Sequence, residues 1–151
     1  MGNPELRGSQ EKRPLRYRQD SESVAPIASF TDFAGDTNAT AVRIEPGDDA
    51  RELLSRIGQL SLVEVTFPAF RDGRGYSSAR ILREAGYKGE LRAAGDVLAD
   101  QLPFMRRCGF DAFAPNVSLD EAVVARLTAI FPDVYQAAAD GAVPVWKLRH
   151  G

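Results

Sequence analysis

The sequence has 151 residues, of which 44% are hydrophobic and 26% are charged, and its formal net charge is −2. Such a chain is long enough for one domain with its own hydrophobic core, and its composition is that of a globular protein in water. The slightly acidic balance, without a basic stripe, argues against a nucleic-acid partner. No apolar run reaches the length that crosses a bilayer, so we expect no membrane association and a cytoplasmic location.

The counts of cysteine and histidine restrict the chemistry of any site. Cys108 is the single cysteine and His150 the single histidine. One residue of each type builds neither a Cys/His metal cluster nor a plausible Ser-His-Asp triad, so no metal is expected and the cofactor, if there is one, stays unknown. Cys108 follows two arginines at the end of a predicted helix, where the helix dipole does not stabilise a thiolate. We therefore interpret it as a buried packing residue.

Composition divides the chain into three parts. Residues 1–37 mix basic residues with Gly, Pro, Ser and Gln and have no apolar period, which predicts a flexible leader. Residues 38–138 are the predicted α/β domain, and residues 139–151 an irregular C-terminal segment. The apolar residues expected to anchor the end of the leader on the domain are Val24, Ile27, Phe30 and Phe33.

Strands and helices alternate through the predicted domain. The predicted strands cover residues 40–45, 62–67, 91–95 and 110–114. The predicted helices run from the capping box of Asp49 and Glu52 to Gly58, over 78–85, over 97–108, and from the capping box of Ser118 and Glu121 to about residue 130. This order predicts about four consecutive βα units with a parallel sheet and right-handed crossovers. The sheet is then either a small doubly wound one or curved like half of an eight-stranded barrel.

Charged residues inside the predicted strands bear on that choice. Glu64, Arg92 and Asp111 interrupt strands that should be almost continuously apolar if both faces were buried. This favours the half-barrel form, whose inner face would present them to a ligand or to a second copy in a homodimer. The alternative is that they lie at strand ends or pair with one another.

The stretch from Phe67 to Leu82 predicts an anion site, because an apolar strand runs into a glycine-rich loop and then into a helix. Gly73 and Gly75 allow close backbone approach, and Ser77 is expected to cap the helix. The side chains that add positive charge around this turn are Arg71, Arg74 and Arg80. We predict a pocket for phosphate, sulfate or sulfite with Arg74 as the direct ligand. The alternative is a structural turn in which the Asp72 carboxylate accepts nearby N–H groups.

The loops that leave the carboxyl ends of the strands suggest a catalytic set. They would gather Asp72, Tyr76 and Asp96, with either aspartate as general base and the tyrosine as acid. The spacing of Gly73, Gly75 and Ser78 resembles a broken dinucleotide fingerprint. The third glycine and the tight strand-to-helix turn are missing, which weakens a nicotinamide or flavin site.

From Glu45 to Ala138 the sequence resembles the bacterial domain of unknown function 934, whose members carry the label of an oxidoreductase involved in sulfite reduction. The runs that carry the resemblance are Phe67-Pro68, Phe70, Asp72 to Ser77, Ala79-Arg80, Gly89 to Ala93, Gly95 to Leu98, Asp100 to Leu102, and Arg107 to Phe113. Pro103 departs from the family pattern. The resemblance implies sulfite reductase as a partner and a place in sulfur assimilation.

Three functions follow as hypotheses. The first is an accessory protein of assimilatory sulfite reduction with a small oxyanion or anionic cofactor at the 72–77 loop. The second is an enzyme, either a nucleotide-dependent oxidoreductase or a small lyase or isomerase on a half-barrel. The third is a dimeric scaffold without catalysis.

Overall fold

The computed structural model describes residues 14–35, 38–69 and 73–129. Its elements in chain order are β1 (Leu15–Arg16), α2 (Phe30–Gly35), β2 (Ala41–Ile44), the 3-10 helix η1 (Ala50–Gln59), β3 (Leu62–Phe67), α3 (Arg74–Glu84), β4 (Glu90–Gly95), the 3-10 helix η2 (Ala99–Gln101), α4 (Leu102–Cys108), β5 (Ala112–Pro115) and α5 (Glu121–Ala129). From β2 onward, a strand followed by a helix occurs four times, as predicted. Arg71, Asp72, the end of the last predicted helix and the segment 139–151 lie outside the described residues.

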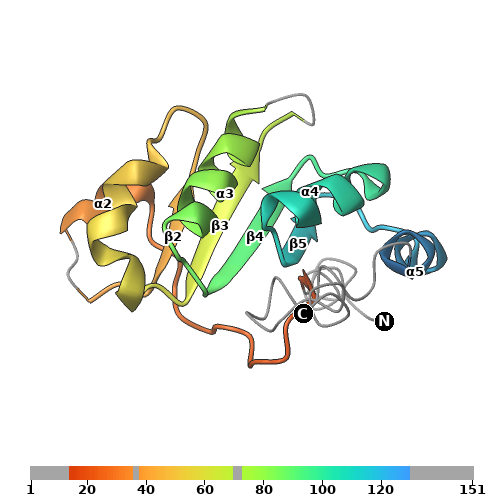
Figure 1. Cartoon of the computed structure of the whole chain (residues 1–151), viewed down its shortest axis with the longest axis horizontal. Helices are drawn as coiled ribbons and strands as arrows, with labels where there is room; N and C mark the ends of the chain where they lie inside the picture. Colours follow the sequence, from red (N-terminus) through yellow and green to blue (C-terminus); the bar gives the residue numbers. More distant parts are fainter. Residues whose placement is uncertain (1–13, 36–37, 70–72, 130–151) are drawn as a thin grey trace, which may run out of the picture.

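The strands form one five-stranded sheet in the order β1-β5-β4-β3-β2 (Figure 1). The pairs among β2, β3, β4 and β5 are parallel, whereas β1 pairs with β5 in the antiparallel direction. The prediction of a parallel sheet is therefore right for the four βα units and wrong for the whole sheet. The parallel strands follow chain order across the sheet, without the reversal of order that marks a doubly wound sheet.

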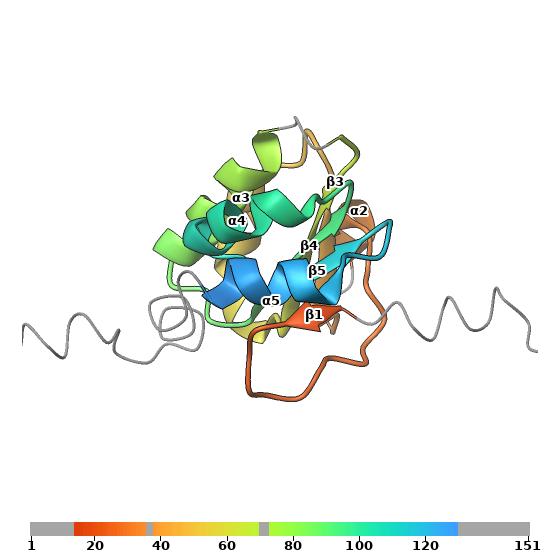
Figure 2. The same cartoon turned by 90° about the vertical axis from the view of Figure 1, so that its right-hand side faces the viewer.

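The hydrophobic core lies between one face of this sheet and the helices α3 and α4, which lie side by side over it (Figures 1 and 2). The sheet contributes every second residue of β3 and β4, as strand geometry requires. The main side chains of this core are Val63, Val65, Phe67, Leu91, Ala93 and Phe113 from the sheet and Ala79, Leu82, Leu102 and Met105 from the helices. No helix among the described residues has the length and apolarity needed to cross a bilayer.

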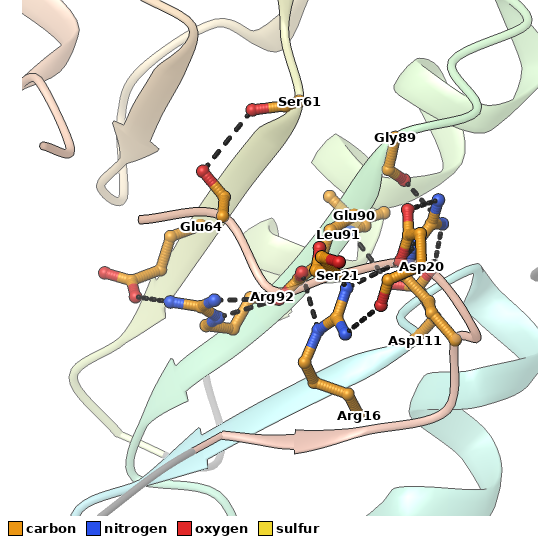
Figure 3. A network of polar contacts seen from close by, with 12 residues as sticks. Arg16, Asp20, Ser21, Ser61, Glu64, Gly89, Glu90, Leu91, Arg92 and Asp111 are labelled. Carbon is orange, nitrogen blue, oxygen red and sulfur yellow. Dashed lines mark hydrogen bonds and ion pairs between the residues drawn. The ribbon is translucent and has the colours of Figure 1, made fainter. Parts of the chain in front are cut away.

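The opposite face of the sheet carries charged side chains that pair with one another (Figure 3). Arg43 Nε lies 2.8 Å from Glu64 Oε1, and Arg92 Nη1 lies 3.6 Å from Glu64 Oε2. Arg92 Nη2 also lies 2.8 Å from Glu90 Oε2. Asp111 differs, because it directly precedes β5 and its Oδ2 accepts from Arg83 of α3 and from Arg18. Glu64 and Arg92 therefore pair with each other and Asp111 lies at a strand end, as the alternative prediction has it.

Both edges of the sheet are covered by one segment, residues 14–28, which we call the strap. At one end β1 pairs with β5. At the other end Ala28 N donates to Ala41 O at 3.0 Å, and Arg43 N donates to Ala28 O at 2.8 Å, so the strap also lines β2. Between these points it runs along the lower side of the molecule in Figure 1. The leader predicted as flexible therefore carries defined structure from residue 14.

The anchors of the leader differ from the expected set. Phe33 is buried, and Phe30 packs against the core. Val24 is 97% exposed, so it anchors nothing. The apolar residues of the strap that do pack against the core are Leu15, Tyr17 and Ala28, and two of its arginines add ion pairs with Glu90 and Asp111.

Several helix ends also differ from prediction. The helix α3 begins at Arg74, four residues before the predicted start, and its N-cap is Gly73, so Ser77 is not the cap. Asp120 caps α5 in place of Ser118, because its Oδ1 accepts from Ala122 N at 2.8 Å. Pro103 lies in the first turn of α4, where no backbone donor is lost.

The first predicted helix and the last predicted strand also differ in type or bounds from the prediction. Asp49 caps η1 as predicted, because its Oδ1 accepts a hydrogen bond from Arg51 N at 3.0 Å. The helix itself is of the 3-10 type. The strand predicted over 110–114 covers Ala112–Pro115. Shifts of this size are common, because the backbone at element ends is held by few hydrogen bonds.

Candidate functional site

An open pocket of about 280 Å³ lies where the carboxyl ends of β2 and β3 meet the start of α3. This is the edge at which ligands of parallel α/β sheets bind. The residues that line it are Ile44, Glu45, Pro46, Gly47, Asp48, Asp49 and Ala50 from β2 and the loop after it, Val65 and Thr66 from β3, and Arg74, Gly75, Ser77, Ser78 and Ile81 from α3. The pocket therefore has a wall formed by α3 and a wall formed by the 45–50 loop.

The α3 wall carries the groups that suit an anion. Arg74 and Ser77 are both exposed residues of the first two turns, and both line the pocket. The N-cap is Gly73, at which no described residue makes a side-chain capping bond, and the helix start carries the positive end of the dipole. A guanidinium fork, a hydroxyl donor and a helix N-terminus together attract a small oxyanion.

Gly75 serves packing. It is buried, and a Cβ atom at this position would lie 2.5 Å from Cζ of the Phe67 ring. The helix can approach the end of β3 only because that atom is missing. Gly95 acts in the same way, since its φ is +100° and a Cβ atom would lie 2.4 Å from the carbonyl oxygen of Phe67. At Gly73, by contrast, nothing lies within 4 Å of an added Cβ atom.

The 45–50 wall is acidic, but its two aspartates are engaged in local turns. Asp48 Oδ2 accepts from Glu45 N at 2.8 Å. Asp49 pairs with Arg51, and the hydrogen bond from that guanidinium lowers the pKa of the Asp49 carboxyl. An anion in this pocket would therefore be bound by the α3 wall and repelled by the facing carboxylates, which limits its affinity.

Tyr76 and Arg80 lie on the side of α3 that faces α4. The ring of Tyr76 contacts Phe67 and Phe104, with centroid distances of 5.3 and 5.0 Å. Burial raises the pKa of its hydroxyl. Arg80 reaches the Cys108 thiol, so it does not join Arg74 at the pocket.

Asp96 follows β4 and is held by its backbone. Its N–H donates to the carbonyl oxygen of Phe67 at 2.7 Å. It does not line the pocket beside β2 and β3. Asp72 falls outside the described residues, so the catalytic set of Asp72, Tyr76 and Asp96 stays a prediction.

Cys108 is buried, as expected from its place at the end of α4. Burial raises the pKa of its thiol, although Arg80 and Arg107 act in the opposite direction. A thiol in this state is a poor nucleophile. Within residues 14–35, 38–69 and 73–129, no three His, Cys, Asp or Glu side chains are grouped in a way that would hold a metal ion.

The structure thus divides the predicted anion set. Arg74, Gly75 and Ser77 meet at the pocket, whereas Gly73 and Arg80 do not line it. Sequence reasoning missed the opposite wall around Asp48. The signal was available, because the Pro46-Gly47 turn also leaves the carboxyl end of a parallel strand and belongs to the same edge.

Comparison with curated proteins gives no significant match, and the same holds for solved structures. A family described as "bacterial protein of unknown function (DUF934)" matches residues 41–146 of the chain. These residues include β2 to β5 and the whole pocket. Since this match covers most of the sequence, the chain belongs to the DUF934 family.

Proposed function

We propose that this protein is an accessory factor of assimilatory sulfite reduction that binds a small oxyanion or an anionic cofactor at the α3 wall of the pocket. The observation that carries the proposal is that Arg74 and Ser77, both at the start of α3, line the same cavity of about 280 Å³. The resemblance of the sequence to proteins labelled for sulfite reduction supports the pathway. Sulfite reductase is the expected partner.

Binding rather than turnover is the role that the side chains support. Arg74 would hold two oxygens of sulfite, sulfate or phosphate through its fork, and Ser77 would donate to a third. The hydroxyl of Tyr76 and the carboxylate of Asp96, which an enzyme would need as acid and base, do not line this pocket. The proposal therefore places the anion on a half-barrel-like series of βα units, where the bound ion would be presented to the partner.

The first experiment measures anion binding with a matched pair of variants. Sulfite, sulfate and phosphate are titrated into the purified protein by calorimetry at constant ionic strength, with chloride as the reference anion. Arg74→Ala is expected to abolish the binding heat, while Arg80→Ala leaves it unchanged. Both arginines are exposed residues of α3, but only Arg74 lines the pocket. Equal loss in both variants would mean that the anion responds to general positive charge and not to the pocket.

A second experiment separates the pathway from the pocket. Immobilised sulfite reductase is tested for binding of the protein with and without sulfite, again with Arg74→Ala. Binding that depends on sulfite and on Arg74 is expected. No binding to the reductase under either condition would remove the partner from the proposal, and a heat of binding with NADPH or a flavin would favour the oxidoreductase in its place.

A further inference from the structure

We propose that the outer edge of β5, together with the buried carboxylates of Glu90 and Asp111, is a docking site for an extended segment of a partner protein that carries arginines two residues apart. In the isolated chain this site is filled by the strap, through Arg16 and Arg18. The side chains involved lie together at the amino ends of β4 and β5 (Figure 3).

The first part of the site is a socket for the guanidinium of Arg18. Its Nη1 donates to Asp111 Oδ2 at 2.6 Å and to Gly89 O at 3.2 Å, and its Nη2 donates to Lys88 O at 3.1 Å. Asp111 is 0% exposed. The strap does not set the position of that carboxylate, because Leu91 N donates to its other oxygen at 2.8 Å and Arg83 Nη2 lies 3.0 Å from Oδ2.

The second part is a socket for Arg16. Its Nε donates to Glu90 Oε1 at 2.9 Å. Glu90 is 2% exposed, and Arg92 holds its other oxygen at 2.8 Å. The domain therefore offers one fixed carboxylate oxygen to each incoming arginine. Charge-assisted hydrogen bonds to buried carboxylates are strong, and the planar guanidinium of arginine suits such sockets better than the compact ammonium group of lysine.

Between the two sockets, the site contacts the backbone and the aromatic ring of Tyr17. Tyr17 N donates to Asp111 O at 2.8 Å, next to the antiparallel pairing of Leu15 with Phe113. The ring of Tyr17 meets the Phe113 ring edge-on at 5.9 Å, and the guanidinium of Arg106 lies 3.9 Å from its centroid. This is recognition by strand addition, in which backbone bonds supply affinity and alternate side chains supply specificity.

The present occupant is suited to displacement. The sockets are built from residues inside the family match 41–146, whereas the strap lies before it. The strand β1 is only two residues long. The stretch that follows it contains the fully exposed Val24 and a long 3.4 Å contact between Ser23 Oγ and Ser61 Oγ. A partner segment that pairs along more of β5 would compete for the same two carboxylates.

The test uses the full chain and a labelled peptide of residues 13–21. In the variant Arg16→Ala/Arg18→Ala the sockets are vacated, so fluorescence polarisation should show the peptide binding to the variant. Binding of the peptide to the wild type is expected to be weaker by about tenfold or more, because the strap of the wild type competes for the same sockets. A peptide in which both arginines are lysines is the matched control and should not bind. Glu22→Ala, at an exposed position of the strap that leaves both arginines and Asp20 in place, should behave as the wild type.

If the peptide does not bind the double variant, hydrogen exchange of residues 14–28 shows whether the strap has left the sockets. Faster exchange in the double variant without peptide binding would overturn the docking site, and unchanged exchange would show that the sockets do not hold the strap. If circular dichroism shows that the double variant is unfolded, Arg18→Lys takes its place with the same expectations. Dimerisation of the wild type by strap exchange, without peptide binding, would assign the site to a second copy and overturn a partner segment.

Discussion

Gly73 and Gly75, at the start of α3, have different physical roles. We predict that Gly75→Ala destabilises the fold by about 1–3 kcal/mol, because its Cβ atom would lie 2.5 Å from the Phe67 ring and the packed core cannot accommodate it. Gly73→Ala should change the free energy of unfolding by much less than Gly75→Ala, since nothing lies within 4 Å of the added atom. Urea unfolding measures both. Equal effects would mean that Phe67 moves aside at no cost.

The thiol of Cys108 offers a second test at this scale. A raised pKa leaves less thiolate at a given pH, and burial also blocks access. We expect alkylation by iodoacetamide at pH 8 to be much slower in the folded protein than in urea. Mass spectrometry follows the reaction. Rapid alkylation of the folded protein would revive a redox or nucleophilic role for this residue.

At the scale of elements, the ion pairs of the strap make the stability of the fold depend on pH. Asp20 accepts from Arg18 and Arg16, and chiefly the hydrogen bond from Arg18 lowers its pKa from 3.8 to about 2. A folded pKa below the unfolded value means that Asp20 stabilises the fold above about pH 4. That contribution is lost as the pH falls through 2.

We therefore predict that Asp20→Asn lowers the melting temperature slightly at pH 6 and that the difference from the wild type vanishes as the pH falls from 5 to 2. The side chain of Asp20 is 53% exposed, so solvent screening keeps the effect below about 1 kcal/mol. Thermal unfolding across this pH range, at low salt, is the measurement. A difference that persists at pH 2 would show that Asp20 acts through packing or local turn structure.

At the scale of the whole molecule, the order of the strands predicts the order of local stability. The central strands β3 and β4 have partners on both sides, while β1 covers an edge with two residues. Hydrogen exchange should therefore be slowest in β3 and β4 and fastest in the strap, because exposed edges open at lower free energy than the core. Protection of the strap equal to that of β3 would mean that it unfolds only with the entire domain.

The βα units can be predicted from the sequence, because the alternation of apolar residues and the short connecting turns depend on local geometry. It also placed Arg74 and Ser77 at the end of a strand, where ligands of such sheets bind. The tertiary structure decided which side of α3 each residue occupies. Starting the helix at Arg74 instead of Ser78 turns Tyr76 and Arg80 towards α4.

The strap was decided by tertiary structure alone. Its sequence has no apolar period, so nothing local predicts a strand at Leu15. Its arginines are ordered by Glu90 and Asp111, more than seventy residues away. Such pairing depends on buried carboxylates that exist only after the sheet has formed, and for that reason no reading of adjacent residues could find it.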